Sequence, residues 1–172
     1  GRGGGDLLRG VAGLVEHVPH KGTRVTELSL GDLADVYRAR LALEPLAVRL
    51  AAAAFTGEDA GEAADALERL VDACGRGEPV EVWATHTSFH FALYRAARSR
   101  WLLRLIAPLW ESSERYRRAS LPVERNLADR QSEHRRILEA CTRRDPDRAA
   151  RETFSHLALT ANLLARAMDG DE

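Results

Sequence analysis

The sequence has little of the residues from which disulfide-bonded or sheet-rich proteins are built. Only two cysteines occur, Cys74 and Cys141, which excludes a disulfide framework and predicts a reducing, cytoplasmic setting. Aromatic residues make up 6% of the chain, and isoleucine occurs only at Ile106 and Ile137. Since strands favour β-branched and aromatic residues, this shortage argues against a large sheet.

Long apolar runs and a large net charge are also missing. No stretch approaches the roughly 18 consecutive apolar residues of a membrane span, and no charged-then-apolar leader opens the chain. The 26 acidic and 25 basic residues nearly cancel, which excludes the overall charge of a protein that coats nucleic acid or a membrane surface. The 172 residues suffice for one full domain with a buried core.

Good helix formers, above all alanine and leucine, dominate most of the chain and predict an all-α fold. Capping patterns begin predicted helices at Ser29 and Thr56, and first-turn prolines begin others at Pro79 and Pro146. Short loops between them predict an antiparallel bundle of about six helices. The expected ranges are 29–54 with a kink at Pro45, 56–75, 79–97, 99–118 with an interruption near Pro108, 124–143 and 146–168.

The first 27 residues have a different composition. A glycine-rich start is followed by two short β-prone pieces, 14–18 and 23–26, on either side of a turn that carries Pro19 and Gly22. This pattern predicts a small β-hairpin with a basic tip. We therefore divide the chain into an N-terminal unit over 1–27 and a helical domain over 28–172.

Four of the six histidines lie on three predicted helices. His86 and His90 are four residues apart, so their rings share one face of a helix, and that face also carries Trp83 and Tyr94. His134 leads an apolar stripe on the fifth helix, and His156 lies on the inward face of the sixth. Neutral imidazole is a common ligand for zinc, nickel, copper and cobalt, so the pattern indicates a metal site. Alternatively, each is a core histidine with hydrogen-bond partners, because spacing does not show that the helices converge.

These histidines belong to a wider pattern: over about 29–168, the chain resembles the effector-binding (FCD) domain of FadR-like GntR transcriptional regulators. The separations of 44 residues from His90 to His134 and 22 from His134 to His156 are close to the ligand spacing of that family. The motifs that carry the resemblance are Tyr37 to Ala54 with Arg40 and Leu43-Glu44-Pro45, Phe89-His90, Glu133-His134-Arg135-Arg136-Ile137-Leu138, and His156.

The resemblance implies a helical bundle that binds a divalent metal through an acid and three histidines, below a cavity for a small organic acid. His90, His134 and His156 match the three histidines, but His86 stands where the family has its acid. A nitrogen in place of a hard oxygen favours zinc, or else nickel, and leaves a site that attracts an anion. Alternatively, the site has drifted and His86 is not a ligand. Arg40 matches an arginine that faces the effector, and its alternative is a structural ion pair with Glu44.

Tyr94 is a candidate for lining the effector cavity, as are Tyr116, Thr160 and Asn162, and the sequence does not show which of them face it. The hairpin resembles the wing of a winged helix-turn-helix. His20, Lys21, Gly22 and Arg24 would then contact DNA. The alternative, which is favoured without the family resemblance, is an ordinary charged turn. A winged helix-turn-helix needs about three helices before its wing. At most twelve glycine-rich residues precede the wing pattern, which begins at Gly13, so we expect most of the DNA-binding domain to be missing from the chain.

We therefore expect a homodimeric, ligand-responsive transcriptional regulator without enzymatic activity. A metal-dependent enzyme acting on a small carboxylate is the alternative, which the sequence disfavours because Glu133 projects about 100° around its helix from His134. A helical dimerisation module without a ligand is the third interpretation. Trp101, Leu102, Leu105 and Trp110 would serve an interface in any of the three and do not separate them.

Overall fold

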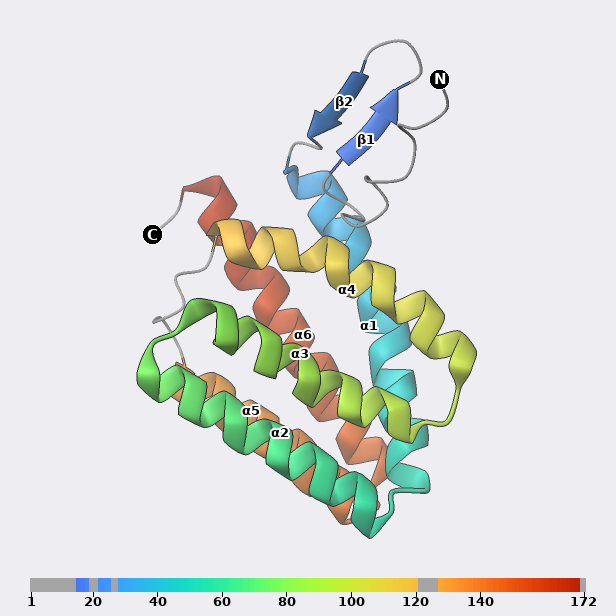
Figure 1. Cartoon of the computed structure of the whole chain (residues 1–172). Helices are drawn as coiled ribbons and strands as arrows, with labels where there is room; N and C mark the ends of the chain where they lie inside the picture. The colour runs from blue at the N-terminus through green and yellow to red at the C-terminus, as the bar shows by residue number, and fades with distance from the viewer. Residues whose placement is uncertain (1–14, 19–21, 26–27, 121–126, 171–172) are drawn as a thin grey trace, which may run out of the picture.

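The computed structural model describes residues 15–18, 22–25, 28–120 and 127–170 of the chain. Within these ranges six helices form a bundle, with a two-stranded hairpin ahead of them (Figure 1). The predicted helical bundle is confirmed. No described helix combines the length and apolar content that a membrane crossing requires. The helices are α1 (Leu30–Ala53), α2 (Gly57–Arg76), α3 (Pro79–Ala96), α4 (Arg100–Ser120), α5 (Leu127–Thr142) and α6 (Pro146–Asp169).

The helices begin where local side chains can bind their free N–H groups. Ser29 accepts a hydrogen bond from the backbone N of Asp32 at 3.1 Å, which fixes the start of α1. Thr56 and Asp59 form a reciprocal capping box at the start of α2. At the other end of α2, Gly77 has φ +68°, a left-handed conformation that glycine adopts without strain.

Proline interrupts neither of the two helices that contain it internally. The expected interruption of the fourth helix near Pro108 was wrong, since α4 continues from Arg100 to Ser120. Pro108 and Arg104, whose carbonyl loses its partner, are both exposed, so water can bind the freed oxygen. In α1, Pro45 is buried, and the helix likewise continues through it to Ala53.

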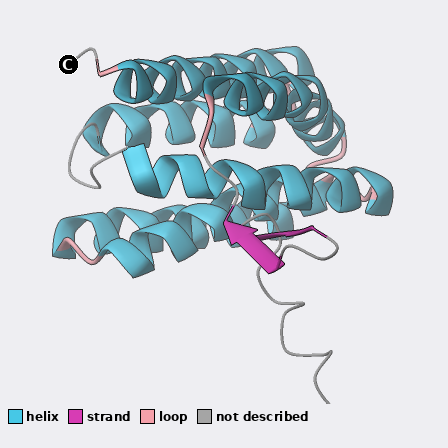
Figure 2. Ribbon diagram, turned by 90° about the horizontal axis from the view of Figure 1, so that it is seen from above, coloured by secondary structure: helices cyan, strands magenta, loops and turns pink. Residues whose placement is uncertain are grey.

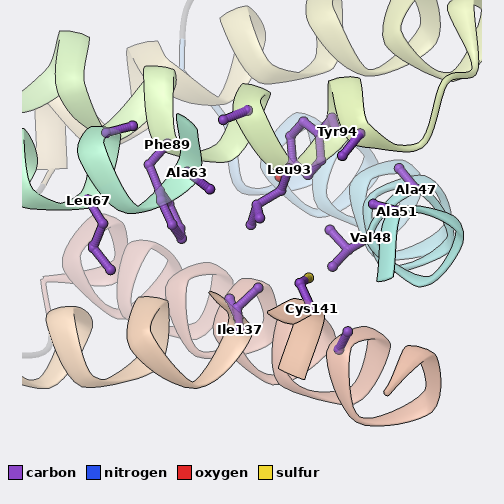
Figure 3. Close-up of a cluster of buried hydrophobic side chains, with 14 of the residues drawn as sticks. Ala47, Val48, Ala51, Ala63, Leu67, Phe89, Leu93, Tyr94, Ile137 and Cys141 are labelled. Atoms are coloured by element: carbon purple, nitrogen blue, oxygen red, sulfur yellow. The ribbon is translucent and has the colours of Figure 1, made fainter. Parts of the chain in front are cut away.

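The helices pack in pairs that bring distant segments together. α6 lies along α1, α3 along α2, and α5 packs against both α2 and α6 (Figure 1). α4 crosses α1, and the view from above shows the helices stacked in layers (Figure 2). The apolar core between these layers is rich in alanine, which allows close approach of the backbones. Its central side chains include Val48, Ala63, Leu93, Ile137 and Cys141 (Figure 3).

Two strands occupy the position predicted for the hairpin, β1 (Val15–Val18) and β2 (Gly22–Val25). They pair antiparallel, with Val15 opposite Val25 and Val18 opposite Gly22. The turn residues 19–21 lie outside the described residues, so His20 and Lys21 are not placed. Gly22 and Arg24 lie in β2. The interpretation of this hairpin as a DNA-binding wing remains a prediction.

Candidate metal centre

The four helical histidines meet inside the bundle. His86 and His90 come from α3, His134 from α5 and His156 from α6, and all four are buried. One ring nitrogen of each lies within 4.8 Å of those of the others. The closest contact, 3.1 Å, joins Nε2 of His90 to Nε2 of His134. Residues separated by up to 70 positions in the sequence thus form one cluster of imidazoles.

The imidazoles of the cluster are uncharged at neutral pH. Burial lowers the pKa of His86, His90 and His134 well below the ordinary histidine value, and the neighbouring rings and guanidinium groups lower it further. Burial likewise lowers the pKa of His156 to about 3, and the charge of Arg130 adds to this effect. A neutral imidazole is the form that binds a transition metal, so the cluster needs little deprotonation before it can act as a ligand set.

Glu133 orients His156. Its Oε2 lies 2.6 Å from Nδ1 of His156, and because that ring is neutral, Nδ1–H donates to the carboxylate. The remaining nitrogen, Nε2, then carries the lone pair. A carboxylate behind a ligating histidine is the usual device that fixes its tautomer and raises its basicity. The sequence had suggested only that Glu133 projects away from His134, and its contact with another helix was missed.

Tyr94 and Glu44 orient His90 in a similar way. Burial and the nearby Glu44 carboxylate raise the pKa of Tyr94 well above its ordinary value, so the hydroxyl keeps its proton and donates to Oε2 of Glu44 at 2.5 Å. The Tyr94 oxygen also lies 3.3 Å from Nδ1 of His90, where it can accept that nitrogen's hydrogen. Tyr94, the expected effector contact, therefore touches the cluster through His90.

Arg40 makes the structural ion pair that was the alternative to an effector contact. Its Nε lies 2.5 Å from Oε1 of Glu44 and its Nη2 3.1 Å from Oε2, while Nη1 donates to Ser113 Oγ at 2.8 Å. The guanidinium is only 1% exposed. Glu44 thus joins Arg40 to Tyr94, and through Tyr94 to the imidazole cluster.

Arg117 is a second buried arginine beside the cluster, and it was not predicted from the sequence. Arg117 of α4 is ion-paired with Glu114, stacks over the Trp110 ring at 4.4 Å, and places Nη1 3.4 Å from Nδ1 of His86. Trp110, Ser113 and Arg117 recur at helical spacing on one face of α4. That periodicity was the signal available in the sequence.

The residues present fit a divalent transition metal. Two buried ring nitrogens, Nε2 of His86 and Nδ1 of His134, have no hydrogen-bond partner among the described residues. Such atoms are costly to bury unless something binds them. An all-nitrogen donor set suits zinc or nickel better than magnesium or calcium. Just outside the cluster, Glu133 and Thr160 line a surface hollow of about 400 Å³ between α5 and α6.

Comparison with known proteins now defines the class: the FCD domain model matches residues 35–159, which places the bundle among FCD domains. The chain belongs to the FadR-like GntR family of transcriptional regulators, as its curated relatives and structural neighbours also indicate. It is 33% identical over 170 residues to the HTH-type transcriptional repressor GlaR of Escherichia coli (strain K12), covering 92% of this chain and 76% of that protein.

Solved structures agree on the fold. E. coli McbR/YncC superposes with a TM-score of 0.78 at 21% identity, and a GntR-type regulator from Rhodococcus sp. RHA1 with a TM-score of 0.73 at 18% identity. Each match covers 89% of this chain and 73% of the other. This chain spans only 61% and 64% of the length of two further curated relatives. These relatives are transcriptional regulators rather than enzymes, which confirms that expectation.

Proposed function

We propose that this chain is the sensing part of a DNA-binding regulator, whose helical domain binds a divalent metal and a small organic acid. The observation that carries the proposal is the convergence of four neutral, buried imidazoles from three helices, His86, His90, His134 and His156. Zinc is the metal that we favour, with nickel as the second choice. Once bound, the metal would supply a Lewis-acidic position for a carboxylate oxygen.

The polar groups around the cluster support an anionic effector. Arg40 and Arg117 place guanidinium groups beside the imidazoles, and among the described residues each is paired with one carboxylate, Glu44 or Glu114. A divalent cation there adds positive charge that an acid can neutralise. We propose that Arg40 contacts this acid through N–H groups not taken by Glu44 and Ser113, and that Tyr94 borders it while holding His90.

Signal transfer requires that the acid bind two arrangements of the protein with different affinity. We propose that these are two arrangements of a homodimer. Trp101 and Leu105 on α4 support such an interface, since they are 60% and 51% exposed and apolar. The hairpin precedes α1, the helix that carries Arg40, and His20, Lys21, Gly22 and Arg24 are proposed to contact DNA.

Removal of one imidazole tests the metal site. We expect His134→Ala to lose the bound metal, measured by elemental analysis after dialysis against a zinc-containing buffer. Arg135→Ala, which changes the exposed neighbour on the same helix, should retain the wild-type content. Equal metal content in His134→Ala and the wild type would refute the site.

A dimerisation module without a ligand is the remaining alternative. Anything that binds only the folded state raises the melting temperature by mass action. We therefore expect added zinc to raise the melting temperature and a chelator to reverse the increase. A melting temperature that neither zinc, nickel nor chelator changes would favour the module.

A further inference from the structure

The four histidines of the cluster do not have equivalent surroundings. His156 faces a carboxylate at Nδ1, from Glu133, and His90 faces the tyrosine oxygen of Tyr94. Those partners accept hydrogen bonds, which leaves Nε2 of each ring as the lone-pair nitrogen. His86 has the opposite neighbour, the guanidinium of Arg117, at 3.4 Å from Nδ1.

A guanidinium can only donate hydrogen bonds. Nδ1 of His86 must therefore accept, and in a neutral ring the hydrogen then resides on Nε2. A protonated nitrogen has no lone pair for a metal. The opposite tautomer would point the Nδ1–H of His86 at the N–H groups of Arg117, and Arg117 is held in place by Glu114 and the Trp110 ring. Arg117, which is not part of the imidazole cluster, thus fixes the tautomer of His86.

The Nε2–H of His86 has no acceptor among the described residues. The side chain is 5% exposed, so water does not replace the missing partner freely, and Nε2 is a buried unpaired donor. An anionic oxygen is the partner that such a donor binds most strongly. Arg117, which contacts His86, itself has a buried Nε without a partner in the described part of the chain, so it offers a second unused donor.

We infer that His86 is not a metal ligand but a hydrogen-bond donor that, with Arg117, binds an oxygen of the acid held against a metal on His90, His134 and His156. The inference rests on the proposed function and narrows it. The acid must therefore present one oxygen to the metal and another to His86.

The tautomer can be measured directly in the whole chain. We expect long-range ¹H–¹⁵N spectra of ¹⁵N-histidine-labelled protein to show His86 protonated at Nε2, both without metal and after zinc loading. His90, His134 and His156 should each show one nitrogen shifted by zinc. A zinc-shifted nitrogen on His86, or a proton on its Nδ1, would overturn the inference.

Matched variants of the histidines separate the role of metal ligand from the role of hydrogen-bond donor to the acid. We expect His86→Phe to retain one zinc per chain while His134→Phe loses it. With acetate as the probe, the zinc-loaded His86→Phe protein should bind about tenfold or more weakly than the wild type, because a hydrogen bond to a charged group is lost. His86→Asn, which restores an N–H donor, should recover part of that affinity.

These outcomes distinguish a failure of the inference about His86 from a failure of the proposed metal-binding function. Zinc loss in His86→Phe equal to that in His134→Phe would make His86 a ligand and overturn only the inference. Failure of the wild type to bind zinc would overturn the proposed function as well. If His86→Phe does not fold, judged by its circular dichroism, His86→Asn and the wild-type spectra still decide the assignment.

Discussion

The interior of the bundle has two regions that are built on different principles. Between α1, α2, α3 and α5, small and apolar side chains such as Val48, Ala63 and Leu93 fill the space (Figure 3). Beside it, α1, α3, α4, α5 and α6 contribute a cluster of buried imidazoles and charged groups, including Arg40 and Arg117. The first region gains stability by excluding water, whereas in the second each buried polar group that lacks a partner costs stability.

The difference between the regions shows how one bundle can carry a polar site at its centre. The apolar region holds the helices at fixed spacing, and the polar region uses that spacing to place donors against acceptors. α3 contributes to both, since Phe89 packs in the apolar cluster and its neighbour His90 lies in the imidazole cluster. Changes in the two regions should therefore differ in what they disturb.

The largest effect is expected from breaking the buried ion pair. Arg40→Leu leaves the Glu44 carboxylate buried without its guanidinium, and we expect a loss of about 3–5 kcal/mol in the free energy of unfolding. Urea denaturation measures this loss. In the matched double variant Arg40→Leu/Glu44→Gln, the loss should be smaller than the sum of the two single losses. Strict additivity would show that the pair does not interact.

A cavity in the apolar region should cost slightly less and spare the metal. Leu93 is completely buried, so Leu93→Ala should lower the free energy of unfolding by about 2–5 kcal/mol. Zinc content per folded chain should stay at the wild-type value. Leu50→Ala, at an exposed position on α1, provides the control and should change stability by less than about 0.5 kcal/mol. Loss of zinc in Leu93→Ala would mean that the regions are not separable.

Much of the apolar region could be predicted from the sequence, because its signals are local. Capping residues at Ser29 and Thr56 and the apolar periodicity fixed the helices to within a few residues. The interruption near Pro108 was predicted wrongly since a proline in an exposed turn leaves a carbonyl that water can satisfy. Whether a helix continues through an internal proline therefore depends on which of its faces is exposed to solvent.

The polar region could be predicted only in part, because its contacts join separate helices. The family resemblance implied that His90, His134 and His156 form a ligand set, and the structure brings them together with His86. Arg117 was missed because the helical spacing that it shares with Trp110 and Ser113 marks an inward face but not a contact with a histidine 31 positions away. Glu44 was recognised as the partner of Arg40, but its bond to Tyr94 depends on how α1 packs on α3.

The carboxylate behind His156 should affect metal affinity with little effect on the fold. Glu133→Gln keeps the shape of the side chain but removes the charge that raises the basicity of the imidazole. We expect zinc affinity, measured by competition with a chelator, to fall about 10- to 100-fold. Glu139→Gln, on the same helix but paired with arginines away from the cluster, should bind zinc as the wild type does. Equal affinities in all three proteins would remove Glu133 from the site.

The smallest effect that we predict is the pH dependence of the stability of the metal-free protein. The native pKa of His156 is about 3, below the value of about 6.5 expected in the unfolded chain, so the unfolded state binds more protons as the pH falls. Stability is therefore complete above about pH 6.5 and declines toward acid, by about 2 kcal/mol between pH 8 and pH 5 from His156 alone. Urea denaturation at the two pH values, with chelator present, measures the decline, and His156→Gln should reduce it. Equal stability at both pH values would mean that the imidazoles are hydrated in the native state, and the polar region would no longer differ from a solvent-filled cleft.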